Sequence, residues 1–171
     1  IGVRLVGSEM CIRDRDDFDK EVEKNMSEPI LLLLSGPNLN LLGEREPETY
    51  GDETLEEHVE AAKNKAAESG FIIEHFQSNH EGEIVDSIHA ARNRCSGIII
   101  NPGAFTHYAW SIHDALSSFE GPVIELHISN PASREPWRHT SVVAPVSSGT
   151  IAGFGAKGYQ MAIDAIVGMI E

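Results

Sequence analysis

Residues 30–40 read ILLLLSGPNLN, and this stretch decides the fold class. It opens with an unbroken Ile/Leu run, which is typical of a strand buried on both faces of a parallel sheet. The Gly-Pro-Asn turn that follows ends the strand. Because ligands of open parallel sheets bind beyond the carboxyl ends of the strands, a functional site is expected to start just after Ser35.

The sequence beyond this stretch alternates between helix and strand patterns. Helices are predicted over residues 54–69, 83–94, 106–118 and 155–170, and further strands over 71–77, 97–100, 122–128 and 150–154, with a short edge strand at 142–145. The first helix begins with TLEE (54–57), a capping-box pattern, and ends at Gly70. Strands separated by helices require crossover connections, so the pattern predicts one α/β domain around a five-stranded parallel sheet.

Residues 1–25 differ in character from the rest of the chain. They mix charges without a sustained period, and VGSEMCIRDR (6–15) resembles translated sequencing-adapter read-through. We expect residues 1–25 to be a gene-model artefact, with a natural start at Met26 and a single domain over 26–171. A short helix over residues 16–25 is the alternative interpretation.

The composition excludes several classes of partner. The chain has 171 residues and a formal net charge of −14, which argues against nucleic acid or an anionic membrane surface. No apolar run approaches the roughly 20 residues that cross a bilayer, and no signal-peptide pattern is recognised, so a cytoplasmic protein is expected. The two cysteines fit neither a disulfide framework nor a zinc motif.

The few cations are distributed unevenly. From Met26 onward there are 8 Lys or Arg against 20 Asp or Glu. Four of these cations stand in or beside predicted loops, namely Arg45, Arg134, Arg138 and Lys157. Scarce cations grouped in loops indicate an anionic ligand.

Polar residues of unusual kinds gather just past the predicted strand ends. The first four strands are followed by, or end in, Asn38, Arg45 and Tyr50; Asn79, His80 and Glu81; Asn101 and His107; and Glu125, His127 and Ser129. The last three alternate along one strand, so their side chains share a face. Polar groups from four strand ends that meet at one edge of a sheet indicate a binding site. The structural alternatives are turn chemistry for the Asn-Pro-Gly at 101–103 and a hydrogen-bonded pair for Glu125 and His127.

One loop carries an Arg and a Tyr close together. Arg45 and Tyr50 are separated by a segment that Pro47 stiffens. A cation near a phenol favours its ionised form, and this makes a general base of a group whose pKa is ordinarily about 10. The alternative is a surface loop whose Arg and Tyr lie in solvent.

Seven segments, taken together, resemble the type II 3-dehydroquinate dehydratases. They are GPNLNLLG (36–43), REPETYG (45–51), FQSNHEGEIVD (76–86), INPGAFTH (100–107), ELHISN (125–130), REPWRHTS (134–141) and GAKGY (155–159). The resemblance runs in order over about residues 30–171, and residues 1–25 have no counterpart in it. It implies a flavodoxin-like three-layer sandwich, catalysis without a cofactor, and a homo-oligomer, commonly a dodecamer of trimers. No metal is expected, because the histidines do not occur at ligand spacings such as H-x-x-x-H. The implied reaction dehydrates 3-dehydroquinate to 3-dehydroshikimate in the shikimate pathway of aromatic amino acid biosynthesis, by anti elimination through an enolate.

The resemblance also implies catalytic roles. Tyr50 would be the base that removes the C2 proton, and Arg45, on the same mobile lid, would stabilise the tyrosinate. His127 would be the acid that protonates the leaving hydroxyl. Asn38 would support the enolate oxygen, and Glu125 would orient the histidine.

Substrate binding is implied for a further set of residues. They are Asn101, His107, Ile128, Ser129 and Arg138, together with Asp114, which would reach the substrate of a neighbouring subunit. Two positions depart from the family pattern: His139-Thr140 stands where two histidines are usual, and Trp137 where Phe is common.

Two other interpretations stay open. A flavin- or nucleotide-binding module of the same topology would require phosphate-cradling Gly, Ser or Thr residues after the first strand, where this chain has Pro37, Asn38 and Leu39. An inactive assembly subunit is the other, and the presence of Arg45, Tyr50 and His127 counts against it. The positions of the lysines, on an exposed helix face or at a helix start, argue against imine chemistry.

Overall fold

The sheet and the helices follow the predicted order along the chain. The structure, a computed structural model, describes residues 28–44 and 52–170. Within these residues five parallel strands pair in the order β2-β1-β3-β4-β5. The strands are β1 (Ile30–Ser35), β2 (Ile72–Gln77), β3 (Cys95–Asn101), β4 (Val123–His127) and β5 (Gly149–Ala152). This strand order is that of the flavodoxin-like fold, and it confirms the predicted fold class.

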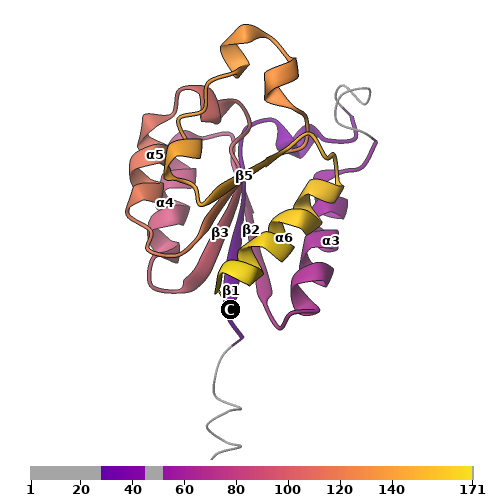
Figure 1. The fold of residues 1–171 in the computed structure, drawn as a ribbon, viewed down its shortest axis with the longest axis vertical. Coiled ribbons are helices and arrows are strands. Elements are labelled where there is room, and N and C mark those ends of the chain that lie inside the picture. The colour runs from indigo at the N-terminus through magenta and orange to yellow at the C-terminus, as the bar shows by residue number, and fades with distance from the viewer. Residues whose placement is uncertain (1–27, 45–51, 171) are drawn as a thin grey trace, which may run out of the picture.

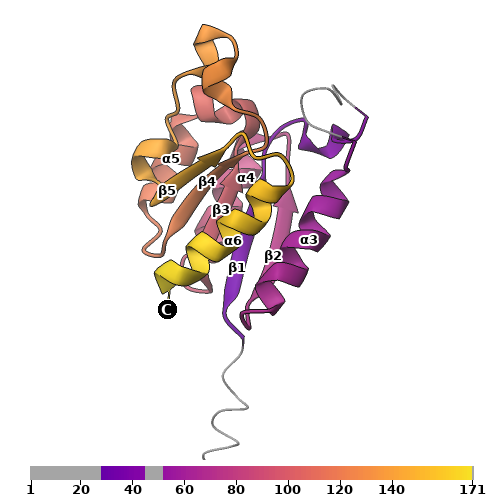
Figure 2. The ribbon, with the colours of Figure 1, turned by 45° about the vertical axis from the view of Figure 1, so that its right-hand side comes forward.

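Two helices cover each face of the sheet. They are α3 (Leu55–Ala67) with α6 (Lys157–Ile170) on one face, and α4 (Glu81–Ala91) with α5 (Trp110–Ser117) on the other. Figure 1 shows the resulting three layers, and Figure 2 shows α6 lying diagonally beside α3. Each helix packs its apolar stripe on the sheet, so the molecule has two cores that are separated by the strands.

The Ile/Leu run of β1 is continuous because alternate side chains enter different cores. Leu31 and Leu33 belong to the core under α3 and α6, whereas Leu32 and Leu34 belong to the core under α4 and α5. All four are at most 3% exposed. Each contributes roughly 1.5–3 kcal/mol of burial free energy, which makes β1 the central support of the sheet.

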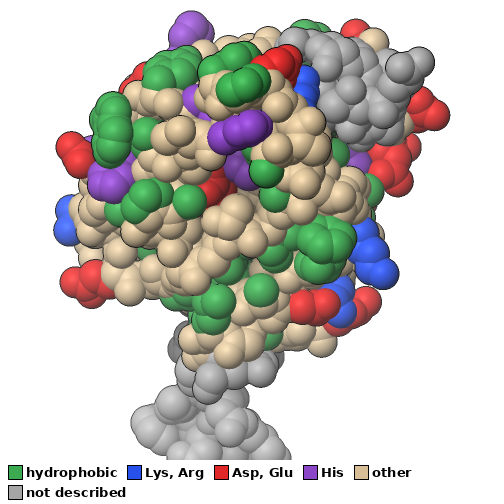
Figure 3. All heavy atoms as spheres, turned by 45° about the horizontal axis from the view of Figure 1, so that its top comes forward, with side chains coloured by type: hydrophobic (Ala, Val, Ile, Leu, Met, Phe, Trp, Pro, Cys, Tyr) green, Lys and Arg blue, Asp and Glu red, His purple; other side chains and the backbone are tan. Residues whose placement is uncertain are grey.

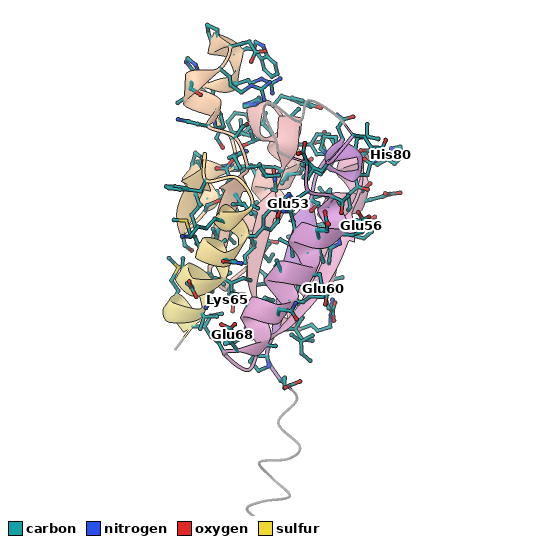
Figure 4. All side chains as sticks on the ribbon, turned by 90° about the vertical axis from the view of Figure 1, so that its right-hand side faces the viewer. Glu53, Glu56, Glu60, Lys65, Glu68 and His80 are labelled. Carbon is teal, nitrogen blue, oxygen red and sulfur yellow. The ribbon has the colours of Figure 1, made fainter. Side chains whose placement is uncertain are left out.

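The predicted capping box at the start of α3 is confirmed. Thr54 Oγ1 accepts from the Glu57 backbone N–H at 3.3 Å, and the Glu57 carboxylate accepts from the Thr54 N–H at 2.7 Å. Near its other end, Lys65 Nζ lies 3.0 Å from Glu68 and 3.1 Å from Asp164 of α6. Figure 4 shows Glu56 and Glu60 on the outer side of α3, and both residues are exposed.

Two predicted elements differ from the structure. The helix expected over 106–118 forms, but it begins only at Trp110, and the residues Gly103–His107 before it form a 3₁₀ helix, η2. The edge strand expected at 142–145 does not form, and Ala144–Val146 is a 3₁₀ turn. Val142 and Val143 are buried against the α4/α5 core, so their apolar character reports packing rather than strand pairing.

Candidate active site

The carboxyl ends of β1, β3 and β4 open into a cavity of about 120 Å³. It is lined by Pro37, Asn38, Leu39, Leu41, Leu42, Asn101, Gly103, Ala104, His107, His127, Ile128, Ser129, Pro131, Arg134 and Arg138. The segment after β4 rises above this edge of the sheet in Figures 1 and 2, and Figure 3 shows histidine side chains gathered there. The cavity lies where chain order reverses between β1 and β3, the position at which open α/β sheets bind ligands.

The turn after β1 is built by a close approach of two strand ends. The Gly36 N–H donates to the Asn101 carbonyl at 2.8 Å. A Cβ at position 36 would lie 2.3 Å from the Pro102 carbonyl oxygen, so only glycine fits. Asn38 adopts the left-handed conformation (φ 64°), which Asn tolerates better than most residues, and its N–H donates to Asn79 Oδ1 at 2.8 Å. These bonds fix Asn38 at the rim of the cavity.

Glu125 and His127 form a buried pair on β4. Glu125 is fully buried and His127 is 9% exposed, and His127 Nε2 lies 2.8 Å from Glu125 Oε1. Three hydroxyl groups surround the same carboxylate. Thr106 Oγ1 donates to Oε1, Ser141 Oγ lies 2.9 and 3.1 Å from the two oxygens, and Thr150 Oγ1 lies 3.4 Å from Oε2.

These partners keep Glu125 ionised. Burial alone would raise the pKa of Glu125, but the hydrogen bond and charge of His127 and the bonds from Thr106 and Ser141 outweigh it, so the pKa is lowered. A carboxylate can only accept, so His127 Nε2 must carry its proton toward Glu125. The other ring nitrogen, Nδ1, is therefore the one left for a ligand in the cavity.

His107 and Arg138 line the cavity, and both contact Trp137. His107 Nδ1 donates to the Thr140 carbonyl at 2.8 Å, and the centre of its ring lies 5.1 Å from that of Trp137, with the two rings nearly perpendicular. The Arg138 guanidinium lies 4.0 Å from the centre of the Trp137 ring, and its Nε donates to Glu135 at 2.8 Å. Thr140 contributes a backbone carbonyl, so this contact does not depend on its side chain.

The structure brings most of the predicted site residues together. The ones that line the cavity are Asn38, Asn101, His107, His127, Ile128, Ser129 and Arg138. Glu125 lies behind His127 without lining the cavity. Asp114 is exposed on α5 and is not among the lining residues of its own chain. Arg45 and Tyr50 lie outside the described residues, so their roles, like those of the other site residues, stay predictions.

Several residues at the site were not predicted to belong to it. Leu39, Leu41 and Leu42 form an apolar wall, and Arg134, noted in the sequence only as a loop cation, lines the cavity. The three leucines belong to the GPNLNLLG motif at 36–43, and this was the sequence signal that could have placed them at the site. Thr106 and Ser141 contact Glu125 across 19 and 16 residues of chain, and no local pattern indicates such a pairing.

The polar lining suits an organic anion. Two guanidinium groups and two imidazoles face one small cavity in a chain with a net charge of −14.

Within residues 28–44 and 52–170, no three His, Cys, Asp or Glu side chains group as metal ligands do. None of the helices described is long and apolar enough to cross a membrane.

Comparisons with known proteins agree with this geometry. The family described as Dehydroquinase class II matches residues 29–167. The "3-dehydroquinate dehydratase 2" of Pseudomonas putida is 50% identical over 143 residues, which cover 84% of this chain and 96% of that protein. The "Catabolic 3-dehydroquinase" of Penicillium rubens is 52% identical over 136 residues, 80% of this chain and 88% of the relative.

Solved structures show the same similarity. The crystal structure of type II dehydroquinase from Butyrivibrio crossotus superposes with a TM-score of 0.79 at 47% identity, covering 81% of this chain and 97% of the other. A type II dehydroquinase from Propionibacterium acnes gives a TM-score of 0.78 at 42% identity, covering 84% and 98%. The fold, the cavity at the β1/β3 edge and these matches over almost the whole described chain lead to one conclusion: the chain belongs to the class II dehydroquinase family.

Proposed function

We propose that this protein dehydrates 3-dehydroquinate to 3-dehydroshikimate, a step of the shikimate pathway. Family membership and relatives named for this activity support the proposal. The observation that carries it is the buried Glu125–His127 pair beside a small cavity that Arg134 and Arg138 also line. A cyclic hydroxylated keto-acid offers a carboxylate for the cations and a leaving hydroxyl for the imidazole.

Elimination next to a ketone requires a base and stabilisation of the developing oxyanion. We propose Tyr50 as the base and Arg45 as the cation that favours its phenolate, on the strength of the REPETYG motif at 45–51. Lowering a phenol pKa from about 10 to about 7 corresponds to roughly 4 kcal/mol, which a neighbouring guanidinium can supply in a closed site. Asn38, at the rim of the cavity, is the proposed support for the enolate oxygen.

His127 is the proposed acid of the second half of the reaction. Glu125 holds the Nε2 proton, so the proton for the leaving hydroxyl would come from Nδ1 of the imidazolium. Base and acid would act from opposite sides of the ring, which is the requirement of an anti elimination. The substrate would be held by Asn101, His107, Ile128, Ser129 and Arg138, all of which line the cavity.

We also propose a homo-oligomer, a dodecamer of trimers. Tyr108, just before α5, is 58% exposed, and Trp110, the first residue of α5, is 62% exposed; the same helix carries Asp114. Exposed aromatic side chains near an acidic residue that would serve a neighbouring site favour an interface there. Light scattering at micromolar concentration is the test, and a monomer would contradict the proposal.

The test of the function compares two tyrosines. Ultraviolet absorbance follows formation of the conjugated enone from 3-dehydroquinate. We expect the parent protein and Tyr108→Phe to form the product and Tyr50→Phe to lose at least about a hundredfold in kcat. Activity should survive borohydride treatment with substrate, because no imine forms. A Tyr50→Phe variant as active as the parent would eliminate the proposed base, and an inactive parent would eliminate the function.

A further inference from the structure

Ser141 belongs to the segment between β4 and β5. Its side chain contacts the carboxylate of Glu125, which is buried behind His127. Its Oγ lies 2.9 and 3.1 Å from the two oxygens of Glu125 and 2.8 Å from Thr106 Oγ1. The same Oγ accepts from the backbone N–H groups of Val143 and Ala144, at 3.0 and 2.8 Å. One hydroxyl thus has five polar contacts.

A count of protons decides which way the Thr106 hydroxyl points. A hydroxyl has two acceptor sites and one proton. Two backbone N–H groups occupy the acceptor sites of Ser141, so Thr106 cannot also donate to it and must send its own proton to Glu125. The proton of Ser141 has two acceptors in reach, Thr106 Oγ1 at 2.8 Å and the Glu125 carboxylate at 2.9 and 3.1 Å, and the anion is the stronger acceptor. With His127 Nε2–H, all these donors point at Glu125.

The backbone on both sides of Ser141 is tied to the site. The Thr140 carbonyl accepts from His107 Nδ1 at 2.8 Å, and the Val142 carbonyl accepts from His113 Nδ1 at 2.7 Å. The Val142 N–H donates to the Thr106 carbonyl at 2.7 Å. Ser141 is therefore held in place, and its hydroxyl can be aimed at Glu125 without loss of further conformational freedom.

We propose that Ser141 is a positioning residue whose hydroxyl, together with that of Thr106, holds Glu125 as a carboxylate and so fixes which ring nitrogen His127 presents to the substrate. Removal of the Ser141 hydroxyl takes one donor from a fully buried anion. The charged form of Glu125 then becomes less favourable, and His127 loses its fixed tautomer. The kinetic part of this inference rests on the proposed function, whereas the charge of Glu125 does not.

Of the titratable side chains around Glu125, that of His127 contacts the carboxylate directly. His107 in η2 and His113 on α5 give their Nδ1 protons to backbone carbonyls. Arg134 and Arg138 line the cavity beside His127, and Glu135 pairs with both of them. Thr150 on β5 and Asn101 on β3 carry no charge. Among the described residues, the state of Glu125 is therefore set by His127 and the hydroxyls.

The test measures the protonation of Glu125 without reference to activity. In protein labelled with ¹³C at the glutamate carboxyl carbons, the Glu125 resonance is assigned by its loss in Glu125→Gln and then followed against pH. We expect this resonance to titrate at higher pH in Ser141→Ala than in the parent. Ser148→Ala is the matched control, because Ser148 Oγ accepts from the Val123 N–H of the same strand and does not contact Glu125. We expect it to titrate as the parent does.

Kinetics supply the second measurement. Ser141→Ala should lower kcat about tenfold with KM within about twofold, the size expected for one hydrogen bond to a charged group. Ser141→Thr, which keeps the hydroxyl, should recover most of the loss. If Ser141→Ala does not fold, Ser141→Cys, a weaker donor, should shift the Glu125 titration in the same direction.

An unchanged Glu125 titration in the folded variant overturns the inference. An inactive parent with a shifted titration in Ser141→Ala would instead refute the proposed function and leave the role of Ser141 in place.

Discussion

Two histidines are buried among the residues that the structure describes, and their surroundings differ. His127 is 9% exposed and lies 2.8 Å from the fully buried Glu125. His58, at the start of α3, is 2% exposed, and the carboxylate nearest to it, that of Glu53, is 3.6 Å away on a side chain that is 57% exposed. The ring of His58 stacks on Tyr159 at 5.1 Å, with 10° between the planes. Within the described residues, His58 Nε2 and the Tyr159 hydroxyl have no hydrogen-bond partner.

From these two surroundings we infer that a buried histidine can transfer a proton only when its second ring nitrogen has a fixed hydrogen-bond partner. The carboxylate of Glu125 accepts from Thr106 and lies within hydrogen-bond distance of Ser141 Oγ and His127 Nε2, and because a carboxylate only accepts, His127 has a defined tautomer. At His58, burial lowers the pKa against the opposing charges of Glu53 and Glu57, and the ring stays neutral as part of an aromatic core. The four predictions that follow test this contrast.

The largest expected effect is the loss of catalysis in Glu125→Gln. An amide would meet the Ser141 and Thr106 hydroxyls with a donor of its own and would no longer hold the His127 tautomer. We expect kcat to fall by at least about a hundredfold while the circular dichroism spectrum stays that of the parent. A variant within a few-fold of the parent kcat would show that the carboxylate has no part in catalysis.

The second prediction concerns acid stability. The pKa of Glu125 is lowered from its ordinary value of 4.5, so it adds stability that is complete above pH 4.5 and is lost as pH falls through the lower folded value. Urea unfolding between pH 6 and 3 should therefore show a steeper fall in the free energy of unfolding for the parent than for Glu125→Gln. Equal slopes would contradict the lowered pKa.

The third prediction concerns His58→Leu, which should be more stable than the parent in acid. The pKa of His58 is lowered from 6.5, so the unfolded chain binds a proton before the folded protein does, and stability falls as pH drops below 6.5. Leu has no such proton and fills the same apolar site. The gain should appear below pH 6.5 and shrink above it, with kcat unchanged. A gain that does not vary with pH would point to packing alone.

The smallest expected effect belongs to Tyr159→Phe. Burial raises the pKa of Tyr159 to about 12, so the hydroxyl stays neutral at any working pH. Because that hydroxyl lacks a hydrogen-bond partner, its removal should change the free energy of unfolding by no more than about 0.5 kcal/mol. A loss of about 2 kcal/mol, measured by the same urea unfolding, would show that the Tyr159 hydroxyl makes a stabilising hydrogen bond to Asn101.

The sequence predicted the framework of this molecule better than its local details. The Ile/Leu run at 30–34 indicated a strand between two cores, and TLEE at 54–57 marked the start of α3, because both signals are local. The prediction of an edge strand at 142–145 was wrong, because two adjacent apolar residues give the same sequence pattern whether they pack in a core or pair in a sheet. The bond between Ser141 and Glu125 could not be predicted, since it depends on how the connection between β4 and β5 folds back onto β4.

For the candidate site too, the sequence predicted the general position better than the local details. The polar residues past the strand ends were expected to converge, and Asn38, Asn101, His107 and His127 line one cavity. Arg134 was recognised only as a loop cation, because its place beside Arg138 depends on how residues 131–138 fold over the sheet edge. Arg45 and Tyr50 lie outside the described residues, and their roles rest on the motif alone.

One measurement tests the contrast between the two histidines most directly: the rate of enone formation from 3-dehydroquinate by the parent, His127→Asn and His58→Asn, compared at the same pH and protein concentration. We expect an active parent, a His58 variant within about threefold of it, and a His127 variant reduced by at least about a hundredfold. An inactive parent, or a His127 variant as fast as the His58 variant, would contradict it.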